Sequence, residues 1–142
     1  MKTFTPKAGE IEKKWYIVDA KDKVLGKLAT KVANALRGKN NPKFAPHIDC
    51  GGFVIVVNCD KVKLTGNKLE GKMYYKHSGF PGALTEISAG DLLAKKPTKV
   101  IELAISGMLP KNKLRPVMMK KLHLFAGEEH PHSAQTPTKL EI

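Results

Sequence analysis

The chain has 142 residues and a formal net charge of +12, with 25 lysines and arginines against 13 aspartates and glutamates. This length suits one domain with a sizeable core, expected over residues 1–142. The charge favours nucleic acid as the partner over an anionic membrane or an acidic protein. The longest apolar run, 53–57, is much shorter than the roughly 20 residues of a membrane-spanning helix. Because no apolar secretory segment begins the chain, we expect a cytoplasmic protein without a membrane partner.

Residues 1–13 mix proline, glycine and charges without periodicity and are expected to form an extended arm. Residues 15–18, Trp-Tyr-Ile-Val, are aromatic and β-branched, which predicts a strand. From Leu25 the apolar residues recur at helical spacing, and Gly38 supplies a typical helix stop. The polar side of this helix is basic. Its candidates for binding an anion are Lys27, Lys31 and Arg37.

The run 53–57, Phe-Val-Ile-Val-Val, is apolar without alternation, which is typical of a central strand covered on both faces. Cys50 and Cys59 flank this strand, one at each end. A disulfide between them is disfavoured by that geometry, so both thiols are expected to be reduced.

A second basic region lies between Lys61 and Lys76, where five lysines accompany the single acidic residue Glu70. Residues 61–65 alternate charged and apolar types and suit a half-exposed strand or a short turn. Residues 73–77 predict a further strand, leading into a glycine- and proline-rich loop at 78–82. The glycines of this region match neither the Walker spacing nor the dinucleotide fingerprint. The candidate anion contacts are Lys68, Lys72, Lys76, His77, Ser78 and Gly79.

Two helices are predicted next. Ser88 with Asp91 resembles a capping box, and Pro97 suits the first position of the following helix, which is expected to end at Gly107.

The segment 107–121 carries five cations and no acidic residue, and Pro110 and Pro116 restrict its backbone. It suits a phosphate backbone, because a rigid array of cations gains affinity by displacing condensed counterions. The alternative is a solvated loop leading into a short helix at about 117–121. A last strand is predicted at 122–126, followed by an irregular tail at 127–142. The candidates here are Lys111, Asn112, Lys113, Arg115, Lys120 and Lys121, with His130, His132 and Gln135 in the tail.

Five histidines and two cysteines raise the question of a metal site. The chain has no Cys-x-x-Cys pair, and His130 and His132 would need further ligands that the spacing does not supply. We therefore expect no metal and no other cofactor. A cysteine nucleophile would need a histidine base beside it in a cleft, and this arrangement is not readable from sequence. Irregular basic loops indicate structured RNA, read by shape, more than a specific DNA sequence.

Several segments, in this order, resemble the family of bacterial large-subunit ribosomal protein thirteen. They are residues 15–20, 25–29, 61–62 with 65–68, 74–79, 107–112 and 130–135. Lys27 stands where the family usually has arginine, which keeps the charge but loses the bidentate fork. Leu114, Arg115 and Pro116 replace the usual Leu-Gly-Arg, and Ala83 replaces a common glycine.

The resemblance implies an α/β fold: a three-layer α/β/α domain with a central, mostly parallel four-stranded sheet and basic loops. It also implies a non-enzymatic role, binding and organising ribosomal RNA during early assembly of the large subunit. The implied partners are large-subunit RNA and neighbouring ribosomal proteins, with no small-molecule substrate. By position, the implied RNA-facing segments are 77–79, 110–121 and 130–135. Two alternatives stay open: a small α/β enzyme acting on a phosphorylated or nucleic-acid substrate, and a regulator that binds messenger RNA.

Overall fold

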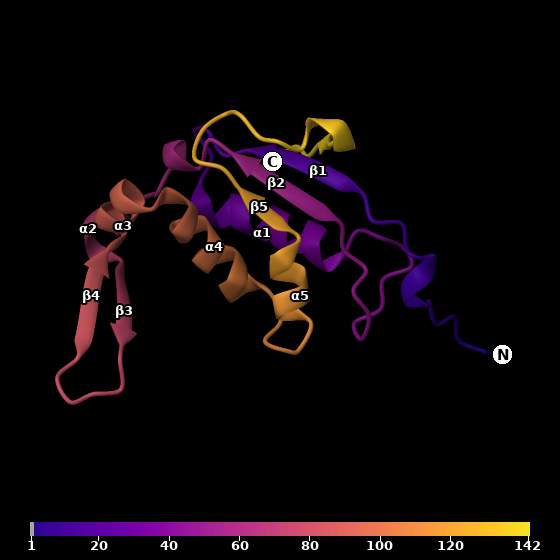
Figure 1. Cartoon of the computed structure of the whole chain (residues 1–142), viewed down its shortest axis with the longest axis horizontal. Helices are drawn as coiled ribbons and strands as arrows, with labels where there is room; N and C mark the ends of the chain where they lie inside the picture. The colour runs from indigo at the N-terminus through magenta and orange to yellow at the C-terminus, as the bar shows by residue number, and fades with distance from the viewer. Residues whose placement is uncertain (1) are drawn as a thin grey trace.

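A parallel sheet lies at the centre of the computed structural model, which describes residues 2–142. Among these residues its four strands are β1 (Trp15–Asp19), β2 (Phe53–Val57), β5 (Leu122–Leu124) and β6 (Thr138–Lys139). Their order is β5-β2-β1-β6, and every neighbouring pair is parallel (Figure 1). Residue Trp15 lies opposite Phe53, and Ile55 lies opposite His123. The prediction of a central strand at 53–57 is confirmed, since Ile55 and its neighbours Val54 and Val56 are completely buried.

Two helices cover one face of this sheet. Helix α1 (Leu25–Arg37) and helix α4 (Pro97–Met108) lie side by side beneath it, and the short helix α5 (Arg115–Lys120) leads into β5. Their apolar sides meet one set of alternate strand residues, as the period of two requires. The largest fully buried members of this core are Val18, Leu28, Val32, Leu36, Val54, Val56, Cys59, Val100, Ile101 and Ile105. Each large aliphatic side chain buried here stabilises the fold by about 1.5–3 kcal/mol.

The opposite face is covered by the C-terminal tail. The tail includes the 3₁₀ helix η3 (Ser133–Gln135), and His132 packs 5.3 Å from the ring of Trp15. The predicted fold class, an α/β fold with a parallel sheet between helical layers, is confirmed. The second layer is thinner than the first, because a single 3₁₀ turn and a loop form it within the described chain.

Helix α1 ends where the sequence predicted. Gly38 adopts φ 78° and donates its N–H to the carbonyl of Asn34. A side chain at this position would collide with the backbone of Cys50, so the close approach of the following loop also requires glycine.

A second unit projects from the end of the molecule opposite the N-terminal arm (Figure 1). It consists of α2 (Lys68–Gly71), β3 (Met73–His77), β4 (Leu84–Ser88) and α3 (Ala89–Lys95), and we call it the hairpin extension. The rest of the folded chain, around the parallel sheet, is the sheet body. Strand β3 was predicted but pairs antiparallel with β4, a strand that was not predicted, rather than joining the central sheet. The predicted cap is confirmed, because Ser88 Oγ accepts a hydrogen bond from Asp91 N–H at 3.2 Å.

Four other predictions need correction. The tail is not irregular throughout, because β6 pairs with β1. The N-terminal arm is not simply extended: it contains the 3₁₀ helix η1 (Ala8–Glu10), and Ile11 is buried against Ala45 and Cys50. Residues 61–65 contribute a single bridge between Lys63 and Val24 after the 3₁₀ helix η2 (Cys59–Lys61), and helix α4 runs one residue past Gly107.

Candidate RNA-binding surface

The loop between α4 and α5 presents two exposed cations on a fixed backbone. Leu109 anchors the loop in the core at 3% exposure. Asn112 Oδ1 accepts the N–H of Leu114 at 3.1 Å, which closes a turn and holds Lys111 and Lys113 in solvent. Asn112 therefore shapes the loop through its side-chain oxygen, and the two lysines carry its charge.

The structure corrects the prediction for Lys121. This residue is 4% exposed, and its Nζ pairs with Asp49 and donates to the carbonyl of Gly51 at 2.9 Å. Lys13 pairs with the same carboxylate at 3.2 Å. Lys121 is thus unavailable to RNA and instead ties the loop before β2 to the start of β5. Its neighbour Lys120 is exposed, so the basic segment ends one residue earlier than expected.

Burial and attraction oppose each other in this buried pair. Desolvation raises the pKa of Asp49, but the hydrogen bond and charge of Lys121, with a contribution from Lys13, outweigh it and lower that pKa below its ordinary 3.8. Burial pulls the pKa of Lys121 down from 10.5, and the bond to Asp49 limits the fall. The Asp49 carboxyl is therefore ionised at neutral pH.

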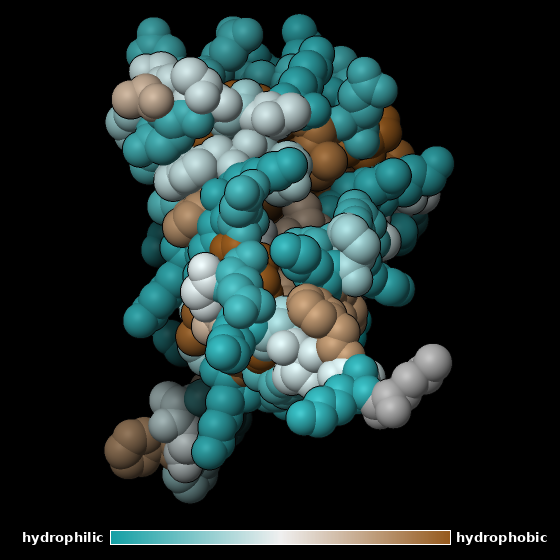
Figure 2. All heavy atoms as spheres, turned by 90° about the vertical axis from the view of Figure 1, so that its right-hand side faces the viewer, coloured by the Kyte–Doolittle hydropathy of each residue, from teal (hydrophilic) through white to brown (hydrophobic). Residues whose placement is uncertain are grey.

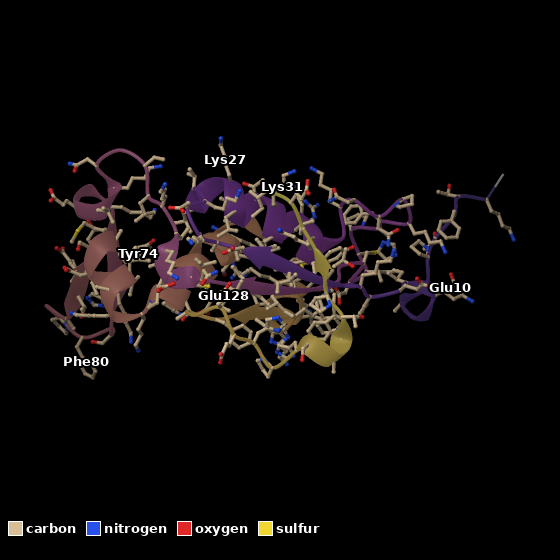
Figure 3. The ribbon with its side chains drawn as sticks, turned by 90° about the horizontal axis from the view of Figure 1, so that it is seen from above. Glu10, Lys27, Lys31, Tyr74, Phe80 and Glu128 are labelled. Atoms are coloured by element: carbon tan, nitrogen blue, oxygen red, sulfur yellow. The ribbon has the colours of Figure 1, made fainter. Side chains whose placement is uncertain are left out.

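Helix α1 presents Lys27 and Lys31 on its outer side, as predicted. Both side chains point away from the sheet (Figure 3). Arg37 differs, because its guanidinium lies 5.3 Å from the centre of the Phe44 ring, a cation–π contact that holds the 39–52 loop. The Arg37 side chain is half-buried, and its guanidinium already contacts the Phe44 ring.

The hairpin extension places its candidates at the two ends of α2, on β3 and in the turn that follows β3. Lys68, Lys72, Lys76 and Ser78 are exposed. The Nδ1 atom of His77 accepts the N–H of Gly79 at 2.9 Å, and Gly79 has φ 93°. The His77 ring is therefore oriented by the turn that follows it.

The tail histidines lie on the opposite side of the sheet from α1. His132 N–H donates to His130 Nδ1 at 3.2 Å. The rings of Trp15 and Phe53 stack at 4.4 Å, and His132 lies 4.5 Å from His123 beside them. The histidines thus fasten the tail to the sheet, and the prediction that they contact RNA stays a prediction, as it does for the exposed Gln135.

The pKa of His123 is lowered from 6.5, first by burial and then by the nearby His132. Sequence reasoning missed this aromatic layer, because the strand register, rather than any local motif, brings Trp15, Phe53 and His123 together.

The predicted residues do not form one compact patch. Lys27 and Lys31 lie on the side of the molecule opposite η3, and the hairpin lies at one end (Figures 1 and 3). Figure 2 shows that hydrophilic side chains also cover most of the face at the N-terminal end. The charge is spread around the molecule, which suits a partner that surrounds it.

The structure gives little support to catalytic chemistry. Burial raises the pKa of the Cys59 thiol to about 12, which makes it a poor nucleophile at neutral pH. Cys50 is buried, and its sulfur accepts the N–H of Ala45 at 3.4 Å. Within residues 2–142, no three histidine, cysteine, aspartate or glutamate side chains gather so that they could hold a metal ion. In the same range, no helix is long and apolar enough to cross a membrane.

The fold and surface define a class: a strongly basic α/β protein whose cations are dispersed over helices and loops around a parallel sheet. Residues 13–131 match the sequence model of the family described as Ribosomal protein L13. The chain belongs to the Ribosomal protein L13 family, a structural and non-enzymatic family, and the resemblance drawn from its motifs is confirmed.

Three relatives illustrate the similarity, each named "Large ribosomal subunit protein uL13". The protein of Desulfovibrio desulfuricans is 54% identical over 142 residues, covering 100% of this chain and 99% of the relative. Those of Salinispora arenicola and Mycobacteroides abscessus are 55% and 56% identical, each over 100% of this chain and 97% of the relative.

Proposed function

We propose that this chain is a structural constituent of the large ribosomal subunit, in the cytoplasm, that binds and organises large-subunit ribosomal RNA during early assembly. Its partners would be that RNA and neighbouring large-subunit proteins. The proposal rests on membership of the Ribosomal protein L13 family and on the number of lysines and arginines that have no carboxylate partner.

One observation carries the proposal. Within residues 2–142, four of the chain's 25 lysines and arginines form a salt bridge: Lys13, Lys63, Lys99 and Lys121. The others lack a carboxylate partner and repel one another across a small protein. Such a distribution favours a polyanion that approaches from several directions, because each phosphate neutralised releases condensed counterions.

The enzyme alternative has less support. It would predict a titratable pair in a closed pocket. The strongest such pair, Lys121 and Asp49, is a buried structural tie. The other shifted carboxylate, Asp19, owes its lowered pKa to hydrogen bonds from the Asn58 side chain and the Lys21 backbone.

The proposal is tested by how salt weakens binding to large-subunit RNA. We expect the double variant Lys111→Gln with Lys113→Gln to reduce the slope of log affinity against log salt by about 2, one for each lysine that no longer neutralises a phosphate. The control is Lys95→Gln with Lys96→Gln, two exposed lysines at the end of α3 that are not among the expected RNA-binding residues. Equal slopes in all three proteins would count against RNA binding by this loop.

A second measurement addresses the assembly itself. The protein in a cell lysate is followed through a magnesium-containing gradient at low and high salt. We expect it to migrate with the large subunit and to be released by high salt alone. A protein that stays in the soluble fraction under all conditions would overturn the proposed function.

A further inference from the structure

A groove of about 360 Å³ lies where the hairpin extension joins the sheet body. The first turn of α1, the segment 63–65, the start of α2, Tyr74 and the C-terminal half of α4 form its walls. The labelled Tyr74 can be found at this junction in Figure 3. The volume lies within the range of small-ligand sites.

The floor of the groove is apolar and open to solvent. Leu103 and Met108, one on each side of the last turn of α4, are 39% and 46% exposed, and Leu64 lies half-buried beside them. The same helix supplies the buried core residues Ile101 and Ile105. A clustered, exposed apolar floor indicates a surface that gains from being covered.

The rim of the groove is cationic. Lys63, Lys68 and Lys72 line it, and its lining contains no aspartate or glutamate. Lys68 Nζ bonds to Thr65 Oγ1 at 3.3 Å, and Lys72 Nζ lies 5.4 Å from the centre of the Tyr74 ring. Lys63 pairs with Asp22, but both side chains are more than half exposed, so the pair is weak and exchangeable.

An apolar floor with three cations at its rim suits a flat ring that has apolar faces and is linked to anionic groups. An apolar side chain of a protein partner would fill the floor but leave the cations unused. A phosphate backbone alone would use the cations but leave the floor exposed.

We propose that this groove receives one unstacked nucleotide of RNA, with its base against Leu64, Leu103 and Met108 and its flanking phosphates on the three lysines. Bases splayed out of RNA loops bind in this way to apolar and aromatic surfaces. The inference rests on the proposed function, because it assigns a site for one nucleotide of the same RNA.

The first test separates base from phosphate. The full-length protein, labelled at its leucine and methionine methyl groups, is titrated with an adenosine trinucleotide and with the same trinucleotide lacking its central base. We expect the intact trinucleotide to shift the methyl signals of Leu64, Leu103 and Met108, and the abasic one to leave them nearly unchanged. Equal shifts with both ligands, or shifts confined to other methyl groups, would overturn the proposal.

The second test uses variants. Met108→Glu places a negative charge on the floor at an exposed position and should weaken trinucleotide binding at least tenfold. Ala94→Glu adds the same charge on the exposed side of α3, away from the groove, and should bind as the native protein does. If Met108→Glu fails to fold by circular dichroism, Lys68→Gln with Lys72→Gln replaces it, with the same expected loss. Unchanged binding in a folded groove variant would refute the site.

The two proposals can fail separately. If the protein migrates with the large subunit but the trinucleotide does not shift its groove methyl signals, the proposed function stands and the nucleotide site is refuted. The groove would then suit a neighbouring protein better. A protein that binds neither the subunit nor the trinucleotide loses both.

Discussion

The sheet body and the hairpin extension differ in how deeply they bury their side chains. In the sheet body, strands that are covered on both faces bury long aliphatic side chains, and even a lysine, Lys121, is drawn inside with a carboxylate partner. In the hairpin extension, two strands pair with each other alone, and Tyr75, Phe80 and Leu84 stand in solvent at 65%, 74% and 53% exposure.

The difference teaches where stability and recognition reside. A two-stranded hairpin is marginally stable by itself in water, so the extension depends on its helices α2 and α3, which pack on each other, and on the contact of α3 with α4. The sheet body carries the stability of the molecule. The extension is free to present side chains that contribute little to folding and are available to a partner.

The largest expected effect comes from opening a cavity in the sheet body. Ile101→Ala removes most of a completely buried side chain from α4 and should lower the free energy of unfolding by about 2–5 kcal/mol. Phe80→Ala, at the exposed tip of the hairpin, should change it by less than about 0.5 kcal/mol. Urea unfolding followed by circular dichroism measures both. Comparable losses would break the distinction between the two regions.

Two neighbouring lysines sharpen the comparison further. Lys121→Met removes the buried partner of Asp49 and leaves Lys13 as its one remaining partner among the described cations. It should lower the free energy of unfolding by about 3 kcal/mol, because a partly buried carboxylate then lacks its main counter-charge. Lys120→Met, one residue earlier and exposed, should be nearly neutral in the same urea unfolding experiment. If the two variants were equally stable, the buried pair would have no structural importance.

A smaller effect is expected at the junction between the regions. Ser88→Ala removes the side-chain cap of α3 and should cost about 1 kcal/mol. Because α3 supports the hairpin, the loss should appear as faster amide hydrogen exchange in α3, β3 and β4, with β1 and β2 unchanged. Ser78→Ala, in the exposed turn of the hairpin, serves as the control. Faster exchange throughout the sheet body would show that the two regions unfold together.

The smallest expected effect concerns pH. The pKa of His123 is lowered in the folded protein by burial and by His132, so the unfolded chain binds a proton at a higher pH than the folded one. The contribution of His123 to stability is complete above its ordinary pKa of 6.5 and is lost as pH falls from 6.5 toward the lowered value. His123→Phe keeps an aromatic ring in this layer and should lose less stability between about pH 8 and pH 5 than the native protein. An identical loss would exclude His123 as a source of the pH dependence.

The sequence predicted the parts of the fold that local pattern controls. The continuous apolar run at 53–57, the helical spacing from Leu25 to Gly38 and the cap at Ser88 each carry their own signal, and each was found where expected. Strand β4 was missed because Leu84, Thr85 and Glu86 are all exposed and show no buried alternation. Strand β6 was missed because two residues, Thr138 and Lys139, become a strand through pairing with β1 alone.

The candidate surface was predictable as charge but not as geometry. Lys120 and Lys121 are identical and adjacent in sequence, and their separate fates depend on where α5 ends and on Asp49, 72 residues away. Arg37 and Phe44 likewise meet through the turn at Gly38. A count of cations cannot find such long-range contacts. The apolar groove at Leu103 and Met108 was missed for the same reason, since α2 and β3 return to α4 through the fold of the extension.

Strand β6 has a consequence for how the molecule forms during its own synthesis. Its partner in β1 is Tyr16, opposite Thr138, so the two halves of this pairing are separated by almost the whole chain. A chain made from its N-terminus can build β1, α1 and β2 early, but the outer edge of β1 stays unpaired until residues 138–139 have been translated. The same final stretch brings η3 and His132 over Trp15. Pairing of β6 therefore closes the outer edge of β1, and a chain that lacked residues 138–139 would leave that strand edge open.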